Sequence, residues 1–328
     1  MARKHKGRAL HGWINLDKPL GLSSAQATAK VRHLLQAAKI GHGGTLDPLA
    51  SGVLPLALGE ATKTVQFAMD GRKEYDFTIE FGSETDSGDA EGAATRTSAH
   101  RPADAELQAA LAPFTGTIQQ RPPAYAAIKV DGTRAYELAR AGQAPEMAPR
   151  TVTVYSLTLL DRPDADYALL RVGCGKGTYV RSLARDIAAA VGSAGHVSQL
   201  RRRRVGGFTL QTAKTLDELA ALVQTSDLDD MDAAAPCATA DLSSFLLPVE
   251  TALDDIPAVA ITHLEAQRLK LGQSISLMRR SDLARLRAAG FDWRDERAEA
   301  LAVADGVPVA LTRFARGSLQ PVRILNLT

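Results

Sequence analysis

A single carboxylate, Asp47, stands in a glycine-rich and apolar loop that runs from residue 41 to residue 52. The four glycines of this loop permit backbone angles closed to other residues, and Pro48 favours an extended conformation of Asp47. The neighbouring leucines would keep water away, so the loop suits an aspartate that is aimed into a pocket to do chemistry. A Thr-x-Asp-Pro sequence is also an ordinary turn, in which the aspartate bonds its own backbone. These twelve residues alone leave both interpretations open.

Two further segments carry side chains of chemical interest. Residues 74–81 alternate strictly between polar and apolar types, which predicts a strand with Tyr75 half buried on its apolar face. Residues 175–182 form a glycine-rich turn that opens a predicted helix to about residue 191, with Tyr179 and Arg181 at its start. The turn lacks the spacing of a Walker phosphate loop. Core packing of the tyrosines and a solvent-facing Arg181 are the alternatives that the residues alone leave open.

The elements that must position these groups follow from local patterns. We expect a strand over residues 12–16, a helix that is capped by Ser23 or Ser24 and stopped by Gly41, and strands over residues 151–160 and 167–174. The acidic residues 84–91 miss the spacing of a calcium loop and predict a polar turn. Near the end of the chain we expect a short helix over residues 263–271 and a hairpin over residues 301–311 with Asp305-Gly306 as its turn.

Composition places the chain among globular proteins. It has 328 residues, 45% of them hydrophobic and 23% charged, which is enough for two domains. The apolar runs are much shorter than the roughly 20 residues that span a bilayer, and no signal sequence follows Met1. Two cysteines are too few for a disulfide framework or a cysteine-rich zinc site. We therefore expect a cytoplasmic protein that works without metal or other cofactor.

Charge is strongly segregated along the chain, although the net charge is only +2. Residues 1–73 hold 11 basic and four acidic side chains, and residues 117–214 hold 15 and seven. Residues 215–255 hold ten acidic side chains and no basic one. Basic segments of this kind predict a surface for a polyanion, with the four arginines 201–204 as the densest block. A charged strand that only meets solvent is the alternative for that block.

Five blocks of sequence occur in the same order as in a known family. They are residues 11–19 (HGWINLDKP), 41–48 (GHGGTLDP), 73–75 (KEY), 176–181 (KGTYVR) and 196–202 (HVSQLRR). On these blocks the chain resembles the TruB family of bacterial tRNA pseudouridine synthases, strongly over residues 10–220 and more loosely after that. The resemblance implies isomerisation of uridine 55 in the T-loop of tRNA to pseudouridine, after the base is flipped out, without metal or other cofactor.

The resemblance also implies roles for individual residues. Asp47 is expected to act on the ribose or the base, by nucleophilic addition or by taking the 2′ proton, with Arg181 beside it to keep it ionised. Tyr75 is expected to stack on the uracil, and Tyr179 and Leu200 to complete the base pocket. His42 is expected to fill the gap left by the flipped base, and Lys18 and Pro19 to support the loop from beneath.

The family fold is an α+β (mixed α/β) fold with a central, largely antiparallel sheet. The resemblance predicts a catalytic domain over residues 1–246, a thumb-like insertion at 121–150 and a small β-rich, PUA-like RNA-binding domain over 247–328. Lys129, Arg134 and Arg202 are expected to contact the T-arm. Residues 281–300 look longer and more helical than the family's tail. We expect a monomer that needs no guide RNA and binds no membrane. A guide-RNA-dependent synthase and a non-catalytic RNA-binding or RNA-folding factor are the alternatives.

Overall fold

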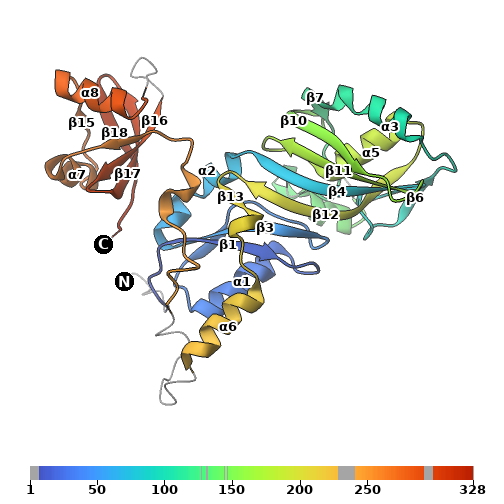
Figure 1. Ribbon diagram of the computed structural model, residues 1–328, viewed down its shortest axis with the longest axis horizontal. Helices are drawn as coiled ribbons and strands as arrows, with labels where there is room; N and C mark the ends of the chain where they lie inside the picture. Colours follow the sequence, from blue (N-terminus) through green and yellow to red (C-terminus); the bar gives the residue numbers. More distant parts are fainter. Residues whose placement is uncertain are drawn as a thin grey trace.

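The computed structural model describes residues 7–126, 128–130, 132–143, 145, 147–227, 241–291 and 298–327. For residues 129, 130, 134, 136, 140 and 224–227 it describes the backbone alone. Within these residues a nine-stranded sheet forms the larger body of the molecule and a five-stranded sheet forms a smaller body near the C-terminus (Figure 1).

The larger sheet has the strand order β1-β3-β12-β4-β11-β10-β7, with β2 beside β3 and β13 beside β12. Every neighbouring pair is antiparallel except β3 and β12. The predicted mixed fold with a largely antiparallel sheet is therefore confirmed. The strands are β1 (Gly12–Lys18), β2 (Ile40–His42), β3 (Ala50–Leu58), β4 (Lys73–Phe81), β7 (Gly116–Gln120), β10 (Arg150–Asp161), β11 (Tyr167–Cys174), β12 (Gly195–Val205) and β13 (Phe208–Thr209).

Helices cover one face of this sheet. They are α1 (Ser24–Leu35), α3 (Asp104–Ala110), α5 (Val180–Ala190) and α6 (Leu216–Asp227). Their apolar residues share one buried cluster with alternate residues of the strands, such as Leu54, Phe77 and Leu170. Because the strand residues between them point the other way, the sheet has one helix-covered face and one second face. The functional side chains described below lie on both.

Helix α1 begins as expected but ends earlier. Ser23 caps it, with its hydroxyl accepting a hydrogen bond from the Gln26 backbone N–H. The helix stops at Leu35 rather than at Gly41, because Gln36 adopts a left-handed conformation (φ 48°). The residues before Gly41 are then free to enter β2, which pairs with β3. The end of the helix is thus set by a strand pairing that the helical pattern does not reveal.

Short elements complete the larger body. They are α2 (Val65–Asp70), β5 (Ser83–Thr85), β6 (Ala94–Thr97), β8 (Lys129–Val130), β9 (Thr133–Arg134), α4 (Ala135–Arg140) and the 3-10 helices η1 (Gly59–Lys63), η2 (Ala112–Phe114), η3 (Leu210–Thr212) and η4 (Val249–Ala252). The acidic segment 84–91 runs from the end of β5 into the turn before β6, as expected of a polar turn. The described part of the predicted insertion holds β8, β9 and α4.

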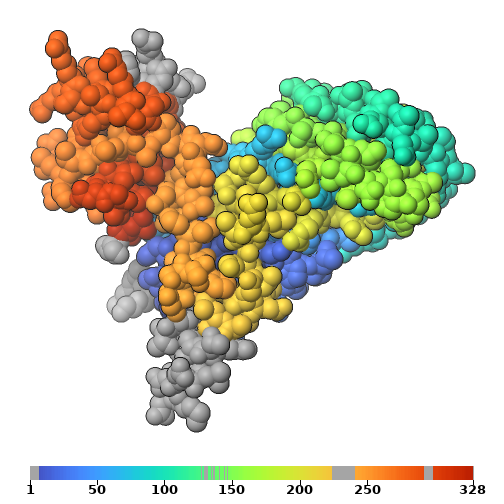
Figure 2. Space-filling model, viewed as in Figure 1, coloured from blue at the N-terminus to red at the C-terminus, as the bar shows by residue number. Residues whose placement is uncertain are grey.

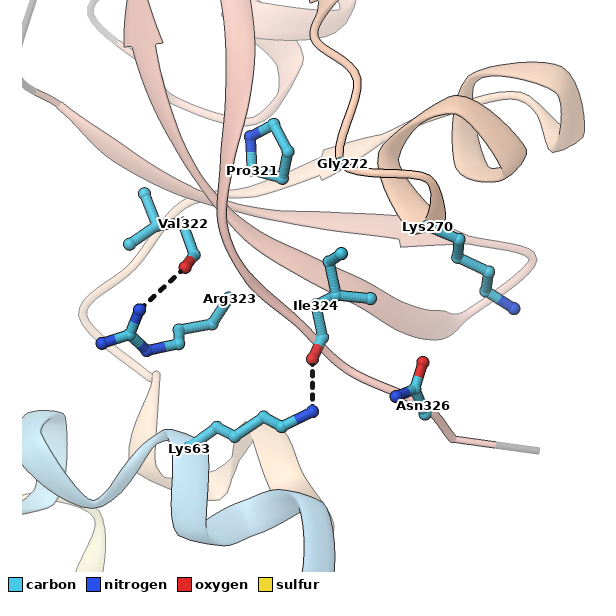
Figure 3. A pocket seen from close by; sticks show the side chains of 8 residues that line it. All are labelled: Lys63, Lys270, Gly272, Pro321, Val322, Arg323, Ile324 and Asn326. Carbon is cyan, nitrogen blue, oxygen red and sulfur yellow. Dashed lines mark hydrogen bonds between the residues drawn. The ribbon is translucent and has the colours of Figure 1, made fainter. Parts of the chain in front are cut away.

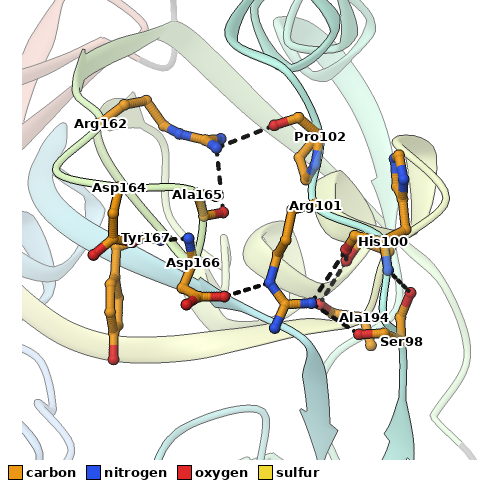
Figure 4. A network of polar contacts seen from close by, with 11 residues as sticks. Ser98, His100, Arg101, Pro102, Arg162, Asp164, Ala165, Asp166, Tyr167 and Ala194 are labelled. Atoms are coloured by element: carbon orange, nitrogen blue, oxygen red, sulfur yellow. Dashed lines mark hydrogen bonds and ion pairs between the residues drawn. The ribbon is translucent and has the colours of Figure 1, made fainter.

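The sheet end farthest from the C-terminal body is fastened by arginines (Figure 4). Arg162, in the turn between β10 and β11, donates to the carbonyls of Pro102 and Ala165. Arg101 pairs with Asp166 and donates to the Ser98 carbonyl. These contacts join the β10–β11 turn to the connection that leads into α3. These two arginines therefore have partners within the protein, although a count of charges alone would include them among the candidates for RNA binding.

The smaller body has the strand order β14-β16-β17-β18-β15. Its elements are β14 (Ala258–Ala260), α7 (His263–Lys270), β15 (Ile275–Ser276), α8 (Arg280–Ala288), β16 (Glu299–Ala304), β17 (Val307–Ala315) and β18 (Ser318–Ile324). Asp305 and Gly306 both have positive φ and form the expected hairpin turn. The extra length at 281–300 includes most of α8, whose Arg285 pairs with Glu265 of α7; residues 292–297 lie outside the described residues.

The two bodies share an apolar junction, because Trp13 of β1 lies in one buried cluster with Leu301 and Leu311 of the smaller body. Trp13 is fully buried, its ring centroid lies 5.1 Å from that of Phe208, and its indole nitrogen donates to the Val249 carbonyl. The backbone of Trp13 also exchanges two hydrogen bonds with Leu247. Figure 2 shows the C-terminal body projecting from one end of the larger one. The division at residues 246 and 247 stays a prediction. No helix in the described residues has the length and apolar character needed to cross a membrane.

Candidate active site

The Asp47 loop connects β2 and β3 and is held from two sides. The Ser24 hydroxyl, at the start of α1, accepts from the Leu46 backbone N–H at 2.7 Å and donates to the Leu46 carbonyl at 2.9 Å. At the other end Gly52 has φ +101°, and a Cβ there would meet the Arg202 carbonyl at 2.2 Å. Only glycine fits this approach of β3 to β12. The loop is fixed, while the Asp47 side chain stays 38% exposed.

Arg202 fastens the loop from β12. Its side chain is fully buried, and the residue is only 2% exposed. The guanidinium donates to three backbone carbonyls, those of Val53 at 2.7 Å and of Gly44 and Thr45 at 3.2 Å each. This geometry favours a loop-holding role over the RNA contact that we expect from the sequence. Arg202 also lines the cavity that holds Asp47 and Tyr75, and its RNA contact remains a prediction.

Arg181 joins two carboxylates. One of its terminal nitrogens lies 3.0 Å from an Asp47 oxygen, and the other lies 3.3 Å from an Asp89 oxygen. The same nitrogens donate to the carbonyls of Ser87 and Tyr125. The Arg181 side chain is 7% exposed, so these contacts form in a poorly hydrated place where charge interactions are strong. The pair therefore places a positive charge directly beside the Asp47 carboxylate.

The predicted base-pocket residues meet in one cavity of about 500 Å³. Its lining includes Asp47, Tyr75, Tyr179, Arg181 and Leu200. Burial raises the pKa of the Tyr75 hydroxyl, against the opposing effect of Arg202, and burial likewise raises the pKa of Tyr179. Both phenols therefore stay neutral near pH 7. The cavity is large enough for one nucleobase and its ribose and offers aromatic, apolar and ionic walls.

His42 lies in a second cavity, of about 570 Å³, rather than in the first. Asp47 and Arg181 line both cavities, so the ion pair stands between them. The His42 Nδ1 atom is buried and has no hydrogen-bond partner within the described residues. Burial lowers the pKa of the imidazole, with Arg202 adding to the effect. His42 therefore presents a neutral ring and an unused polar atom.

Lys18 and Pro19 lie next to the Asp47 loop. The buried Lys18 ammonium donates to the carbonyls of Pro19 and Leu22 at 2.9 and 2.6 Å. Burial lowers the pKa of Lys18 to about 8, while the negative charge of Asp47 opposes the shift. The Gly21 backbone N–H donates to the Pro48 carbonyl at 2.9 Å. This turn is thus tied to the residue that follows Asp47, which agrees with the expected support role.

The other predicted RNA contacts divide into two groups. Arg201 and Arg203 flank Arg202 on β12 and point to the opposite face of the sheet. There Arg201 pairs with Asp17 at 2.7 Å, and Arg203 pairs with Asp76 at 3.0 Å. The side chains of Lys129 and Arg134 lie outside the described residues.

The structure adds two side chains that sequence reasoning missed. Asp89, in the acidic turn before β6, is buried and binds Arg181 from the side opposite Asp47. No local signal marks it, because its partner is 92 residues away. Lys73 lines the first cavity beside Tyr75, and burial lowers its pKa to about 8. Its position two residues before Tyr75 on the same strand face was the available signal. Among the described residues, no group of three or more His, Cys, Asp or Glu side chains has a geometry that could hold a metal ion.

Comparisons with known proteins agree with this geometry. Residues 32–180 match the model of the TruB family pseudouridylate synthase N-terminal domain, and residues 181–254 match that of the tRNA pseudouridylate synthase B C-terminal domain. The chain is 50% identical over its full length, and over the full length of the relative, to tRNA pseudouridine synthase B of Caulobacter sp. strain K31. It is 45% identical to the enzyme of that name from Rhodospirillum rubrum, again over the whole of both chains.

A solved structure supports the fold. The crystal structure of a Cbf5-Nop10-Gar1 complex matches with a TM-score of 0.70 over 96% of this chain and 85% of that chain, at 24% identity. Together with the two family models, which between them cover residues 32–254, and with relatives close to half identical from end to end, these matches leave one assignment. The chain belongs to the TruB family of pseudouridylate synthases.

Proposed function

We propose that the protein converts uridine 55 in the T-loop of tRNA to pseudouridine. The observation that carries this proposal is the Asp47–Arg181 ion pair in the wall of a cavity that also holds Tyr75 and Tyr179. Exchange of the N1 glycosidic bond for a C5 bond needs an ionised group near the ribose. The name of the relatives, tRNA pseudouridine synthase B, supports the substrate.

The roles of the residues follow from their places in the cavity. Asp47 either adds to the sugar or base or removes the 2′ proton, and Arg181 keeps it charged in both routes. Tyr75 offers its ring as a stacking partner for the uracil, and Leu200 supplies an apolar wall. A nucleotide seated in this cavity would displace water from the exposed side of Asp47, so the carboxylate would act on it with little screening.

We assign the extrusion of the base from the RNA stack to the neighbouring cavity, which His42 lines. Flipping a nucleotide costs a few kcal/mol, which the protein must offset with new contacts. His42 stands in that cavity with a neutral ring and an unpartnered Nδ1 atom. We propose that this atom finds its partner on the RNA when the uridine leaves its stack. Lys18 and Pro19 hold the Asp47 loop in place meanwhile.

The C-terminal body offers a second contact for tRNA. A pocket of about 420 Å³ lies where this body meets η1, and three cationic side chains line it: Lys63, Lys270 and Arg323 (Figure 3). The Lys63 ammonium also donates to the Ile324 carbonyl at 2.7 Å, which ties the last strand to the larger body. We propose that the PUA-like domain over 247–328 uses this pocket for phosphates of the acceptor end. The thumb-like insertion at 121–150 would grip the T-arm.

We further propose that the protein acts alone, as a monomer in the cytoplasm without guide RNA or cofactor. The support for a reaction without cofactor is that the conversion is an isomerisation with no net redox change. Light scattering after gel filtration measures the monomer. A guide-RNA-dependent synthase would stay inactive on a bare tRNA transcript.

The test is pseudouridine formation at position 55 of an unmodified tRNA transcript, measured by mass spectrometry with wild type and Asp47→Asn. The asparagine keeps the shape of the side chain but carries no charge. We expect product from wild type alone, with equal tRNA affinity for both proteins. Binding without product from wild type would refute the proposal in favour of a non-catalytic RNA-binding factor. Product from both would remove Asp47 from the mechanism.

A further inference from the structure

Gln120, the last residue of β7, bonds the backbone of Tyr179 with both ends of its side-chain amide. Its side-chain oxygen accepts from the Tyr179 backbone N–H at 2.8 Å, and its side-chain nitrogen donates to the Tyr179 carbonyl at 3.1 Å. The residue is only 2% exposed. Glutamine is mostly found on protein surfaces, so a buried one whose amide bonds both the N–H and the carbonyl of one residue has a specific task.

Tyr179 stands at the start of α5. Tyr179 is the N-cap residue of the helix, in an extended conformation, and no side chain of its own first turn caps it. Its carbonyl also accepts the first helical hydrogen bond, from the Leu183 N–H at 3.0 Å. Helix starts commonly rely on a Ser, Thr, Asp or Asn at this place. Here the orientation of the first turn depends on a side chain from a strand about sixty residues earlier.

The first turn of α5 carries the ionic partner of the catalytic aspartate. Arg181 follows Tyr179 by two residues, and its guanidinium reaches Asp47 at 3.0 Å. A second tie next to Gln120 joins the same turn, since the Ser182 hydroxyl donates to the Arg121 carbonyl at 2.8 Å. A displacement of about 1 Å at a reacting centre can cost on the order of 100-fold in rate. A small rotation of this turn would move both Tyr179 and Arg181.

We propose that Gln120 is a positioning residue for the isomerisation, which sets Tyr179 and Arg181 against Asp47 without touching the substrate. It lines neither cavity, so it acts through the helix start. Arg121, the residue after it, begins the predicted thumb-like insertion, and the Tyr125 carbonyl within that insertion accepts from Arg181. The inference rests on the proposed function for its readout in rate, and on geometry alone for its readout in structure.

The chain supplies a matched control. Gln119 is the neighbouring residue of the same type, is exposed, and donates only to the Thr151 hydroxyl at 2.9 Å. We expect Gln120→Met to lower the single-turnover rate of pseudouridine formation at saturating tRNA by at least about 10-fold, with tRNA affinity within about twofold of wild type. Gln119→Met should retain the wild-type rate.

Gln120→Glu gives the sharper readout and keeps the test valid if the methionine variant does not fold. A protonated glutamic acid can still accept from Tyr179 N–H and donate to Tyr179 O, whereas the carboxylate faces that carbonyl without a proton. Burial raises the pKa of such an acid. The rate of Gln120→Glu relative to wild type should therefore rise as the pH falls from 8 to 6. A purely structural residue would show no such change in ratio.

Nitrogen-proton NMR of the arginine guanidinium groups separates this inference from the proposed function. The Arg181 signal should shift in Gln120→Met and stay in place in Gln119→Met, even with no substrate present. A Gln120→Met rate close to that of an active wild type, or an Arg181 signal that does not move in this variant, would overturn the positioning role. An inactive wild type with a shifted Arg181 signal in Gln120→Met would instead refute the proposed function and leave the positioning role standing.

Discussion

Strand β12 presents two kinds of arginine on the two faces of the central sheet. On the helix-covered face, Arg202 is buried, bonds three backbone carbonyls and fixes the Asp47 loop. On the opposite face, Arg201 and Arg203 are 41% and 37% exposed in their side chains and pair with acids of β1 and β4. Adjacent residues of one type thus do different work, and strand alternation decides which.

The opposite face behaves as a balanced ionic surface. Asp76 lies at its centre, between Arg203 and Arg171. Burial by itself would raise the pKa of Asp76, but hydrogen bonds from these two arginines outweigh it and lower the pKa. Arginines that are already neutralised by nearby carboxylates attract phosphate weakly. A dense basic block in a sequence is therefore not necessarily a nucleic-acid surface.

Of the substitutions that test the difference between the two faces, Arg181→Lys on the helix-covered face should have the largest effect on activity. One ammonium cannot reach Asp47, Asp89 and two carbonyls at once, so we expect a loss of at least about 10³-fold in single-turnover rate. The tRNA affinity should stay within about threefold. Arg185→Lys, one turn later on α5 and paired with Asp186, is the control. Retention of a tenth of the activity by Arg181→Lys would contradict this assignment.

Arg202→Met tests the buried arginine of β12 through stability. The buried hydrogen bond to the Val53 carbonyl and the two partly buried ones to Gly44 and Thr45 are lost, and each buried group left unsatisfied costs about 1–3 kcal/mol. We expect the free energy of unfolding in urea to drop by about 3 kcal/mol or more. Arg204→Met, two residues along the strand and exposed, should cost less than about 1 kcal/mol. Equal losses in both variants would erase the distinction between buried and exposed arginines.

Lys73, on the helix-covered face, should make the stability of the protein depend on pH. Its pKa is about 8 in the folded protein and 10.5 for an unperturbed lysine, so the unfolded state binds more protons above pH 8. The free energy of unfolding should then rise with pH by about 1 kcal/mol between pH 7 and 9 from this residue alone. Urea unfolding of wild type and Lys73→Met at both pH values isolates the contribution. An identical pH response of the two proteins would show that the buried amine does not titrate in this range.

The smallest effect is expected on the opposite face. Arg203→Ala removes a partly exposed ion pair, so stability should fall by less than about 1 kcal/mol. Affinity for tRNA should change less than about twofold, and its dependence on salt concentration should stay the same. A weaker affinity with a shallower salt dependence would show that RNA crosses this face. It would also restore the arginine block to the role that charge counting predicts.

Local sequence signals predicted much of the fold because local physics decides those elements. The Ser23 cap, the alternation along β4 and the Asp305-Gly306 turn all depend on near neighbours in the chain, and the structure confirms each. The end of α1 was predicted wrongly at Gly41 because the pairing of β2 with β3 decides it. Elements whose bounds depend on distant partners escape a reading of local pattern.

The candidate site divides in the same way. Six of its expected residues line one cavity, but they were found by position in family motifs rather than by chemistry alone. Asp89 and Gln120 act through contacts with residues of α5 and its cap, far away in sequence, and carry no motif of their own. The opposite orientation of Arg202 and Arg203 follows from alternation, yet which of them faces the site is fixed by the register of β12 with β3 and β4.

The apolar junction between the two bodies has a consequence for folding while the chain is being synthesised. Trp13 leaves the ribosome early, whereas Leu247 and Val249, which complete its hydrogen bonds, follow more than 230 residues later. At about 5–20 residues per second, that delay is on the order of 10–50 s. During this time the first strand has an unpaired edge and a bare tryptophan. Until about three quarters of the chain has been synthesised, the outer edge of β1 therefore lacks the backbone partner that Leu247 supplies.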